Sequence, residues 1–196
     1  MQLPTQLLGV VRARVLGQVD EKGAGLACVK ALVAGVGIGG LATGIALGRA
    51  GLDVEIFERT SELREIGAGL MIWPNGMRSL ETLGVEVRTL AVDRITLGDS
   101  RGKRLMDPPV EGAMQRYGSN ISFVHRADLQ AALAKSFGEE GLHLGCDVRG
   151  FIDEESRVGV MLRDGVVANG DFLRQGAGDE PGIASHPRQP FGAAGG

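Results

Sequence analysis

The sequence has few cysteines, no excess of basic charge and no long apolar run, and each of these features excludes a class of protein. The two cysteines, Cys28 and Cys146, are too few for a disulfide scaffold and match no metal-ligand spacing. They are typical of a reduced pair, so we predict a cytoplasmic protein without a metal centre. No apolar run approaches the roughly 20 residues of a membrane-spanning helix. The formal net charge of −3 at pH 7 gives no electrostatic basis for binding nucleic acid.

Glycine, in contrast, is abundant, with 32 glycines among 196 residues against about 7% in an average protein. Some lie in a turn motif described below, and others crowd the carboxyl end. We predict an N-terminal extension without stable structure over residues 1–28, one domain over residues 29–175, and a disordered glycine- and proline-rich tail over residues 176–196. A transit peptide is the alternative for the extension, because Arg12 and Arg14 lie in an apolar stretch.

The first ordered segment has the pattern of a β-α-β unit. Residues 31–34 form an apolar run that ends in glycines, as a buried parallel strand does. Residues 38–50 have helical spacing with small residues on one face. Residues 54–57 alternate and end on Glu58, which indicates a second strand parallel to the first. A strand, a tight glycine turn, a helix and a strand within about 30 residues predict an α/β fold.

Further elements follow along the chain. Residues 60–71 are expected to form an irregular loop. Pro74 is placed to open a helix that Gly84 ends. The other expected elements are short strands within residues 85–120, including 94–97, a helix at 126–137, a strand at 142–144, a hairpin of residues 157–162 and 166–168 around an Asp-Gly turn, and a strand that begins at Asp171.

The motif that carries chemistry is a G-x-G-x-x-G sequence, which lies directly between the first strand and the helix. Gly35 allows the tight turn, Gly37 lets the main chain approach a pyrophosphate, and Gly40 lets the helix pack closely on the strand. Free N–H groups and the positive end of the helix dipole then face the phosphates. Glu58 lies 23 residues after Gly35, near the offset of the acid that binds ribose hydroxyls and repels a 2′-phosphate. These features predict an adenine dinucleotide site and leave NAD and FAD as open alternatives.

Four segments carry a resemblance to a known family. Residues 29–59, VKALVAGVGIGGLATGIALGRAGLDVEIFER, resemble the N-terminal fingerprint of the group A flavoprotein monooxygenases, which include salicylate, hydroxybenzoate and urate hydroxylases. Three further segments agree in order and spacing, namely LREIGAGLMIWPNGMRSLETLG at 63–84, VHRADLQAAL at 124–133 and VGVMLRDGVVANGDFL at 158–173. A plain NAD dehydrogenase is not expected to share all of them.

The resemblance implies an FAD-binding Rossmann-like β-α-β domain with a parallel sheet and a β-ribbon, and an incomplete substrate domain. It also implies FAD as cofactor, NADH or NADPH as electron donor, and oxygen-dependent hydroxylation of an aromatic or heteroaromatic small molecule. No catalytic acid or base is identified. The residues that match the family's cofactor-binding positions are Gly35, Gly37, Gly39 and Gly40 in the phosphate turn, Glu58 and Arg59 at the ribose and adenosine, Met71 near the flavin end, Arg126 at a helix start, and Val148 near the adenine.

The sequence departs from the family pattern after residue 173. Arg174 and Gln175 fall where the family has a buried apolar strand, and a charge there is expected to lack a partner. The family's D-G-x-x-S-x-x-R motif is echoed between Asp179 and Arg188 only if extra residues are allowed, and its later G-D motif is absent. The open alternatives are an active monooxygenase, an inactive fragment that retains dinucleotide binding, and a NAD-linked dehydrogenase, against which the segments after Glu58 argue.

Overall fold

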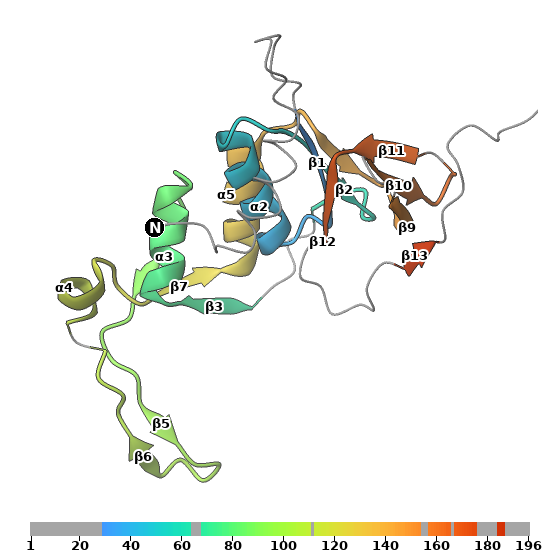
Figure 1. The fold of residues 1–196 in the computed structure, drawn as a ribbon. Coiled ribbons are helices and arrows are strands. Elements are labelled where there is room, and N and C mark those ends of the chain that lie inside the picture. Colours follow the sequence, from blue (N-terminus) through green and yellow to red (C-terminus); the bar gives the residue numbers. More distant parts are fainter. Residues whose placement is uncertain are drawn as a thin grey trace, which may run out of the picture.

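The computed structural model describes residues 29–63, 68–110, 112–153, 157–165, 167–175 and 184–186 (Figure 1). The expected N-terminal extension lies outside these residues. Within the expected tail only Ala184–His186 is described, and it forms strand β13. This short segment therefore differs from the prediction of a tail without structure.

A four-stranded parallel sheet forms the centre of the fold, in the order β12-β1-β2-β8. Its strands are β1 (Lys30–Ala34), β2 (Asp53–Glu58), β8 (Leu142–Leu144) and β12 (Phe172–Gln175). Helix α2 (Ile38–Arg49) connects β1 to β2. The β-α-β unit predicted from the glycine pattern is therefore confirmed, as is the strand predicted at residues 142–144.

Helices α2 and α5 (Arg126–Phe137) lie side by side on one face of this sheet (Figure 1). Successive strand residues point to opposite faces, so Val33 and Ile56 join the core beneath the helices. At Gly44 an added Cβ would lie 2.7 Å from the Ile56 side chain and 3.0 Å from the Phe137 ring. The absence of a side chain at Gly44 therefore lets α2 pack closely on both β2 and α5. The predicted helix at 126–137 has the observed bounds of α5.

A second sheet covers the opposite face, in the order β11-β10-β9-β13. It consists of β9 (Val148–Asp153), β10 (Val158–Leu162), β11 (Val167–Gly170) and β13. Strands β10 and β11 pair antiparallel, which confirms the predicted hairpin. Val158 and Val160 pack with Leu32 and Phe57 of the parallel sheet in a second buried cluster. The parallel sheet is thus enclosed between a helical layer and a β layer.

A third sheet, in the order β3-β7-β4, lies beyond α5 together with two helices and a projecting hairpin (Figure 1). These elements are β3 (Gly69–Ile72), α3 (Pro74–Thr82), β4 (Leu90–Ala91), β5 (Leu97–Gly98), β6 (Arg104–Met106), α4 (Ala113–Tyr117) and β7 (Ser122–His125). The helix expected from Pro74 is confirmed as α3.

Two expectations in this region are wrong. Residues 69–71 were expected in a loop but pair antiparallel with β7, because the partner strand about fifty residues later supplies their hydrogen bonds. Residues 94–96 were expected in a strand but are not in one, and the strand β5 begins only at Leu97.

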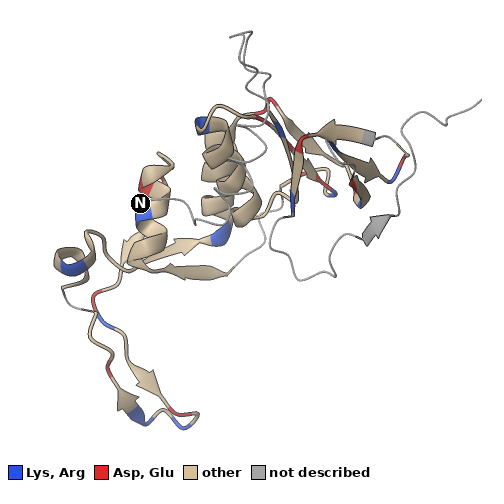
Figure 2. Ribbon diagram, in the orientation of Figure 1, with Lys and Arg blue, Asp and Glu red and all other residues tan. Residues whose placement is uncertain are grey.

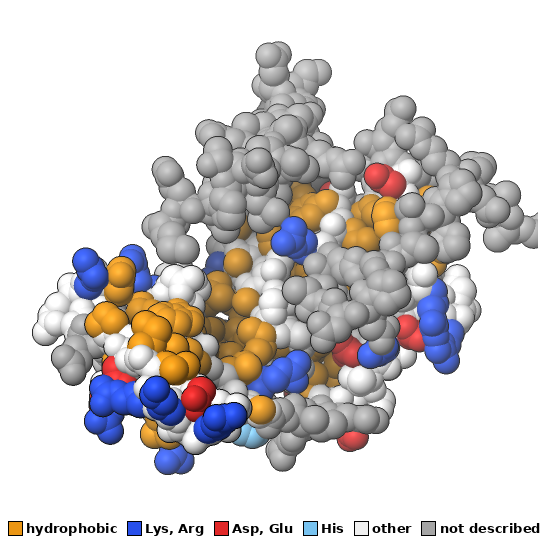
Figure 3. Space-filling view, turned by 90° about the horizontal axis from the view of Figure 1, so that it is seen from below, with side chains coloured by type: hydrophobic (Ala, Val, Ile, Leu, Met, Phe, Trp, Pro, Cys, Tyr) orange, Lys and Arg blue, Asp and Glu red, His pale blue; other side chains and the backbone are white. Residues whose placement is uncertain are grey.

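Large apolar side chains are exposed over the third sheet, α4 and the projecting hairpin, where they gather beside Lys and Arg side chains (Figure 3). A two-stranded hairpin on its own is only marginally stable in water, and contiguous exposed apolar patches are typical of contact surfaces. This region therefore has the character of a contact surface. The exposed residues are Met71, Trp73, Leu90, Leu97, Leu105, Met106, Met114, Tyr117 and Phe123.

Strand β12 contains Arg174, a charged residue at a position where the sequence pattern predicted a buried apolar strand. Arg174 pairs with Val33 of β1, as a parallel strand requires, but its side chain is exposed. β12 is the outermost strand of the described parallel sheet, so the guanidinium reaches solvent. The expected burial of a charge at Arg174 is therefore wrong.

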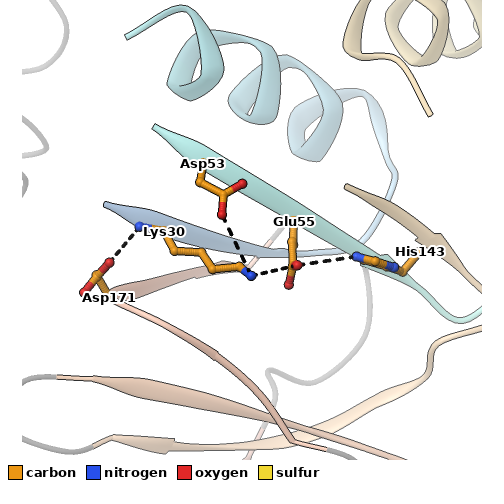
Figure 4. A network of polar contacts seen from close by, with 5 residues as sticks. All are labelled: Lys30, Asp53, Glu55, His143 and Asp171. Carbon is orange, nitrogen blue, oxygen red and sulfur yellow. Dashed lines mark hydrogen bonds and ion pairs between the residues drawn. The ribbon is translucent and has the colours of Figure 1, made fainter. Parts of the chain in front are cut away.

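A polar network joins the amino-terminal parts of β1 and β2 to the entry of β12 and extends to His143 in β8 (Figure 4). The Lys30 amine lies 2.8 Å from a Glu55 carboxylate oxygen and 3.9 Å from Asp53. The Lys30 backbone N–H donates to the Asp171 carboxylate at 2.6 Å, which fixes the entry to β12. The His143 imidazole lies 3.9 Å from Glu55 and stacks on the Phe57 ring. Dinucleotides bind at the carboxyl ends of parallel strands, so we assign this network to stability and not to binding.

The Lys30–Glu55 contact predicts how stability responds to high pH. The hydrogen bond that the Lys30 ammonium donates to the Glu55 carboxylate raises the pKa of Lys30 above its ordinary value, against the opposing effect of burial. The contact therefore contributes fully below the unfolded pKa of about 10.4 and is lost as pH rises through the folded value. Glu55→Gln should cost about 0.5–1 kcal/mol at pH 7 and should lose less stability than wild type between pH 9 and 11. Urea denaturation at each pH measures this.

Asp53→Asn serves as the control, because Asp53 is farther from the amine and half-exposed, so its effect should be smaller. An equal loss of stability above pH 10 in wild type and Glu55→Gln would show that the contact is not the cause.

Candidate functional site

The turn between β1 and α2 lies at the carboxyl ends of the parallel strands. The chain adds β2 and β8 on one side of β1 and returns to place β12 on the other, so strand order reverses at β1. Crevices at such a reversal are the usual ligand sites of open α/β sheets. The Gly35 N–H donates to the Phe57 carbonyl at 2.7 Å, with Gly35 at φ +98°. Only glycine adopts that backbone readily, so the tight turn predicted at Gly35 is present.

The amino end of α2 is open on the side of this turn. A Cβ added at Gly37 or Gly39 would meet no atom within 4 Å. A Cβ at Gly40 would overlap the Gly35 carbonyl oxygen, so Gly40 is the position that allows the helix to meet the strand. In the described structure no side chain caps the first turn of α2, and this turn has no acidic residue. Its N–H groups and the positive end of its dipole are therefore directed at open space.

Glu58 connects the end of β2 to the glycine turn. One carboxylate oxygen, Oε2, accepts from the Val36 N–H at 2.9 Å. The other, Oε1, accepts from the Thr60 N–H at 3.0 Å and from the Thr60 hydroxyl at 3.1 Å. The side chain is half-buried. The acid that the sequence predicted to bind ribose is therefore held beside the glycine turn by charge-assisted hydrogen bonds.

Helix α5 contributes a residue that the sequence reasoning missed. The Gln130 amide donates to the Val36 carbonyl at 2.8 Å, so both polar groups of the Val36 backbone have partners. Gln130 lies one helical turn after Arg126, so the two residues share a face of α5. The four-residue spacing from Arg126, a predicted site residue, is the sequence signal that could have identified Gln130. Arg126 itself is the first residue of α5 and is half-buried.

A second group of residues forms an open pocket of about 410 Å³ beyond Glu58. The Cys146 N–H donates to the Glu58 carbonyl at 2.7 Å, and the Gly145 N–H donates to the Thr60 carbonyl at 2.9 Å. These bonds place the segment before β9 against the segment after β2. Val148 is the first residue of β9 and is half-buried. The pocket is lined by Arg59, Thr60, Ser61, Glu62, Gly145, Asp147 and Arg163.

Met71 is the predicted site residue that lies in a different sheet from the others. It pairs with Phe123 in β3-β7, and its side chain is 38% exposed. A further pocket of about 380 Å³ lies near this sheet and is lined by Trp73, Pro74, Asn75, Arg78 and Tyr117. The structure therefore joins the glycine turn, Glu58 and α5 directly. Met71 lies on β3, which adjoins the start of α5, because the Arg126 N–H donates to the Ala68 carbonyl at 3.3 Å.

In the part of the chain that the structure describes, no three His, Cys, Asp or Glu side chains form a group that holds a metal ion. Among the same residues, no helix has the length and apolar character that crossing a bilayer requires. Charges of both signs are interspersed along the chain, and α2 has a charged residue only at its carboxyl end (Figure 2).

Comparison with known proteins defines the class to which this site belongs. The family model described as FAD binding domain matches residues 28–168. The chain therefore belongs to the FAD binding domain family.

Individual relatives are monooxygenases and hydroxylases by name. The chain is 38% identical over 146 residues to aurachin C monooxygenase/isomerase of Stigmatella aurantiaca, covering 72% of this chain and 38% of that protein. It is 31% identical over 154 residues to FAD-dependent urate hydroxylase of Klebsiella pneumoniae, covering 74% of this chain and 39% of that protein. The solved structure of Klebsiella pneumoniae HpxO with FAD and uric acid matches with a TM-score of 0.65 and 31% identity, over 74% of this chain and 38% of that chain. The chain thus spans well under half the length of these relatives.

The packing of α2 predicts that alanine substitutions at two of its glycines have opposite effects on stability. Gly40→Ala should destabilise the fold by about 1–3 kcal/mol, because the new methyl group overlaps the Gly35 carbonyl and forces α2 away from β1. Gly48→Ala is the matched control, since its methyl group would meet no atom within 4 Å. Gly48→Ala should stabilise the helix by about 0.5–1 kcal/mol. Thermal denaturation of both variants measures this, and equal stability of Gly40→Ala and wild type would mean that the turn is not packed as described.

Proposed function

We propose that this chain binds FAD through its adenosine and pyrophosphate half, as part of an enzyme that hydroxylates aromatic or heteroaromatic rings. The observation that carries the proposal is the position of the Glu58 carboxylate, 2.9 Å from the Val36 N–H of the glycine turn. A ribose acid and a phosphate turn in direct contact form the two halves of an adenine dinucleotide site.

The residues present fit the cofactor that the family binds. Each carboxylate oxygen has two acceptor positions. Oε1 of Glu58 uses both for Thr60, whereas Oε2 uses one for Val36 and keeps one for a ribose hydroxyl. The open space at Gly37 and Gly39 leaves room for phosphate oxygens to reach the N–H groups of the first turn of α2.

The other predicted site residues are assigned to parts of the cofactor according to where they lie in the structure. Arg59 lines the pocket beyond Glu58, and Val148 follows the pocket residue Asp147, so we place the adenosine in this pocket. Arg126 begins the helix whose Gln130 supports the turn, and we assign it a contact to the cofactor. Met71 is assigned to the flavin end, where the third sheet begins.

The choice of FAD over NAD is supported by the family model and by the relative named FAD-dependent urate hydroxylase. When bound, the flavin supplies the redox chemistry, passing electrons from NADH or NADPH to oxygen. The residues described here bind and orient its nucleotide half. A cytoplasmic location and a small aromatic substrate complete the proposal.

Glu58→Gln tests the central contact of the proposal. A glutamine keeps one acceptor oxygen but presents an amide group where the carboxylate accepts from Val36 or Thr60, and it removes the charge. We expect the affinity for FAD and for ADP to fall by about 1–2 kcal/mol, near tenfold. Calorimetric titration with FAD, ADP and 2′-phospho-ADP measures this, and wild type should prefer ADP to its 2′-phosphorylated form.

Glu86→Gln is the control, because Glu86 is exposed and outside the site. It should bind ADP as wild type does. If wild type binds ADP and Glu58→Gln binds it equally well, Glu58 is not the ribose acid.

A further inference from the structure

The turn of the β10–β11 hairpin is fastened to the entry of β9 by one acidic residue. Asp147 Oδ2 lies 2.7 Å from an Arg149 guanidinium nitrogen and 3.0 Å from one of Arg163. The Arg163 N–H also donates to the Asp147 carbonyl at 2.9 Å. The Asp147 side chain is only 21% exposed, whereas both arginines are more than half exposed. Asp147 therefore fixes the position of Arg163 through both its backbone and its carboxylate.

This arrangement places Arg163 on the pocket assigned to the adenosine. Arg163 and Asp147 line one side of the pocket, and Arg59 with the residues after it lines the other. The two sides are held together by the hydrogen bonds from Gly145 and Cys146 to the segment that ends β2. A volume of about 410 Å³ lies within the usual range of about 300–1,000 Å³ for small-molecule pockets.

The charges of the pocket favour a neutral ring over a further phosphate. Two guanidinium groups, Arg59 and Arg163, are balanced by two carboxylates, Glu62 and Asp147. Glu58 lies next to the pocket and adds negative charge. A planar guanidinium stacks well on an aromatic ring, and an arginine already held by a carboxylate loses less freedom when it does so.

We propose that Arg163 forms a wall of the adenine subsite and that Asp147 is the positioning residue that holds it there. This inference rests on the proposed function, since it assumes that the pocket receives the adenosine. Arg163 is 70% exposed, and an ion pair with so exposed a partner contributes little to stability. The effect of Asp147 should therefore be seen in base recognition and not in folding.

The test compares ADP with UDP, which share the ribose and diphosphate but differ in the base. Calorimetric titrations are run on wild type, Asp147→Asn, Arg163→Met and the double variant. We expect the ratio of ADP affinity to UDP affinity to fall by about two- to fivefold in both single variants, as expected for loss of one guanidinium–ring contact. The double variant should show no further fall, because both changes remove the same contact. The urea midpoint should stay close to that of wild type.

Arg149→Met is the matched control, since Arg149 shares the Asp147 oxygen but does not line the pocket. It should leave the ADP-to-UDP ratio unchanged, and an equal fall in this variant would overturn the assignment of Arg163. Unchanged ratios in Asp147→Asn and Arg163→Met, with wild type binding ADP, would overturn the inference alone. A wild-type chain that binds neither nucleotide would overturn the proposed function and this inference together.

Discussion

The hydrogen bonds that hold the glycine turn against the end of β2 are the interaction on which the rest of the site depends. Gly35 donates to the Phe57 carbonyl, Val36 donates to the Glu58 carboxylate, and Gln130 of α5 donates to the Val36 carbonyl. The turn is therefore fixed from the neighbouring strand and from a helix distant in sequence. Its own N–H groups at the start of α2 stay directed outward, which is what a phosphate site requires.

The two ends of the parallel sheet serve different purposes. The carboxyl ends carry the glycine turn, Glu58 and the pocket, where backbone and charged groups face open space. The amino ends carry the contacts of Lys30 with Glu55 and Asp171, which join three strands. Between them, buried residues such as Leu32 and Ile56 fill both faces of the sheet. A rigid centre of this kind lets a short turn and one carboxylate keep a defined geometry.

Local patterns in the sequence were sufficient for the elements that form the site. The glycine spacing, the alternation before Glu58 and the apolar face of residues 126–137 each reflect a geometry that nearby residues determine. Three features depend on distant partners and were not predicted. Strand β3 forms because β7 pairs with it. Gln130 reaches the Val36 carbonyl because α5 packs beside α2. Arg174 is exposed because β12 lies at the edge of the described sheet. Sequence reasoning gives no direct measure of which strand is outermost.

The most direct test of the account is to follow the backbone amide resonances of the nitrogen-15-labelled chain while ADP is added. The account predicts the largest shifts at Val36 and the first turn of α2, with smaller shifts at Thr60 and Cys146, whose N–H groups bond to Glu58. The amides of Trp73 and Tyr117, which line the other pocket, should barely move. Shifts concentrated at Trp73 and Tyr117, with Val36 unchanged, would contradict the claim that the glycine turn and Glu58 form the nucleotide site.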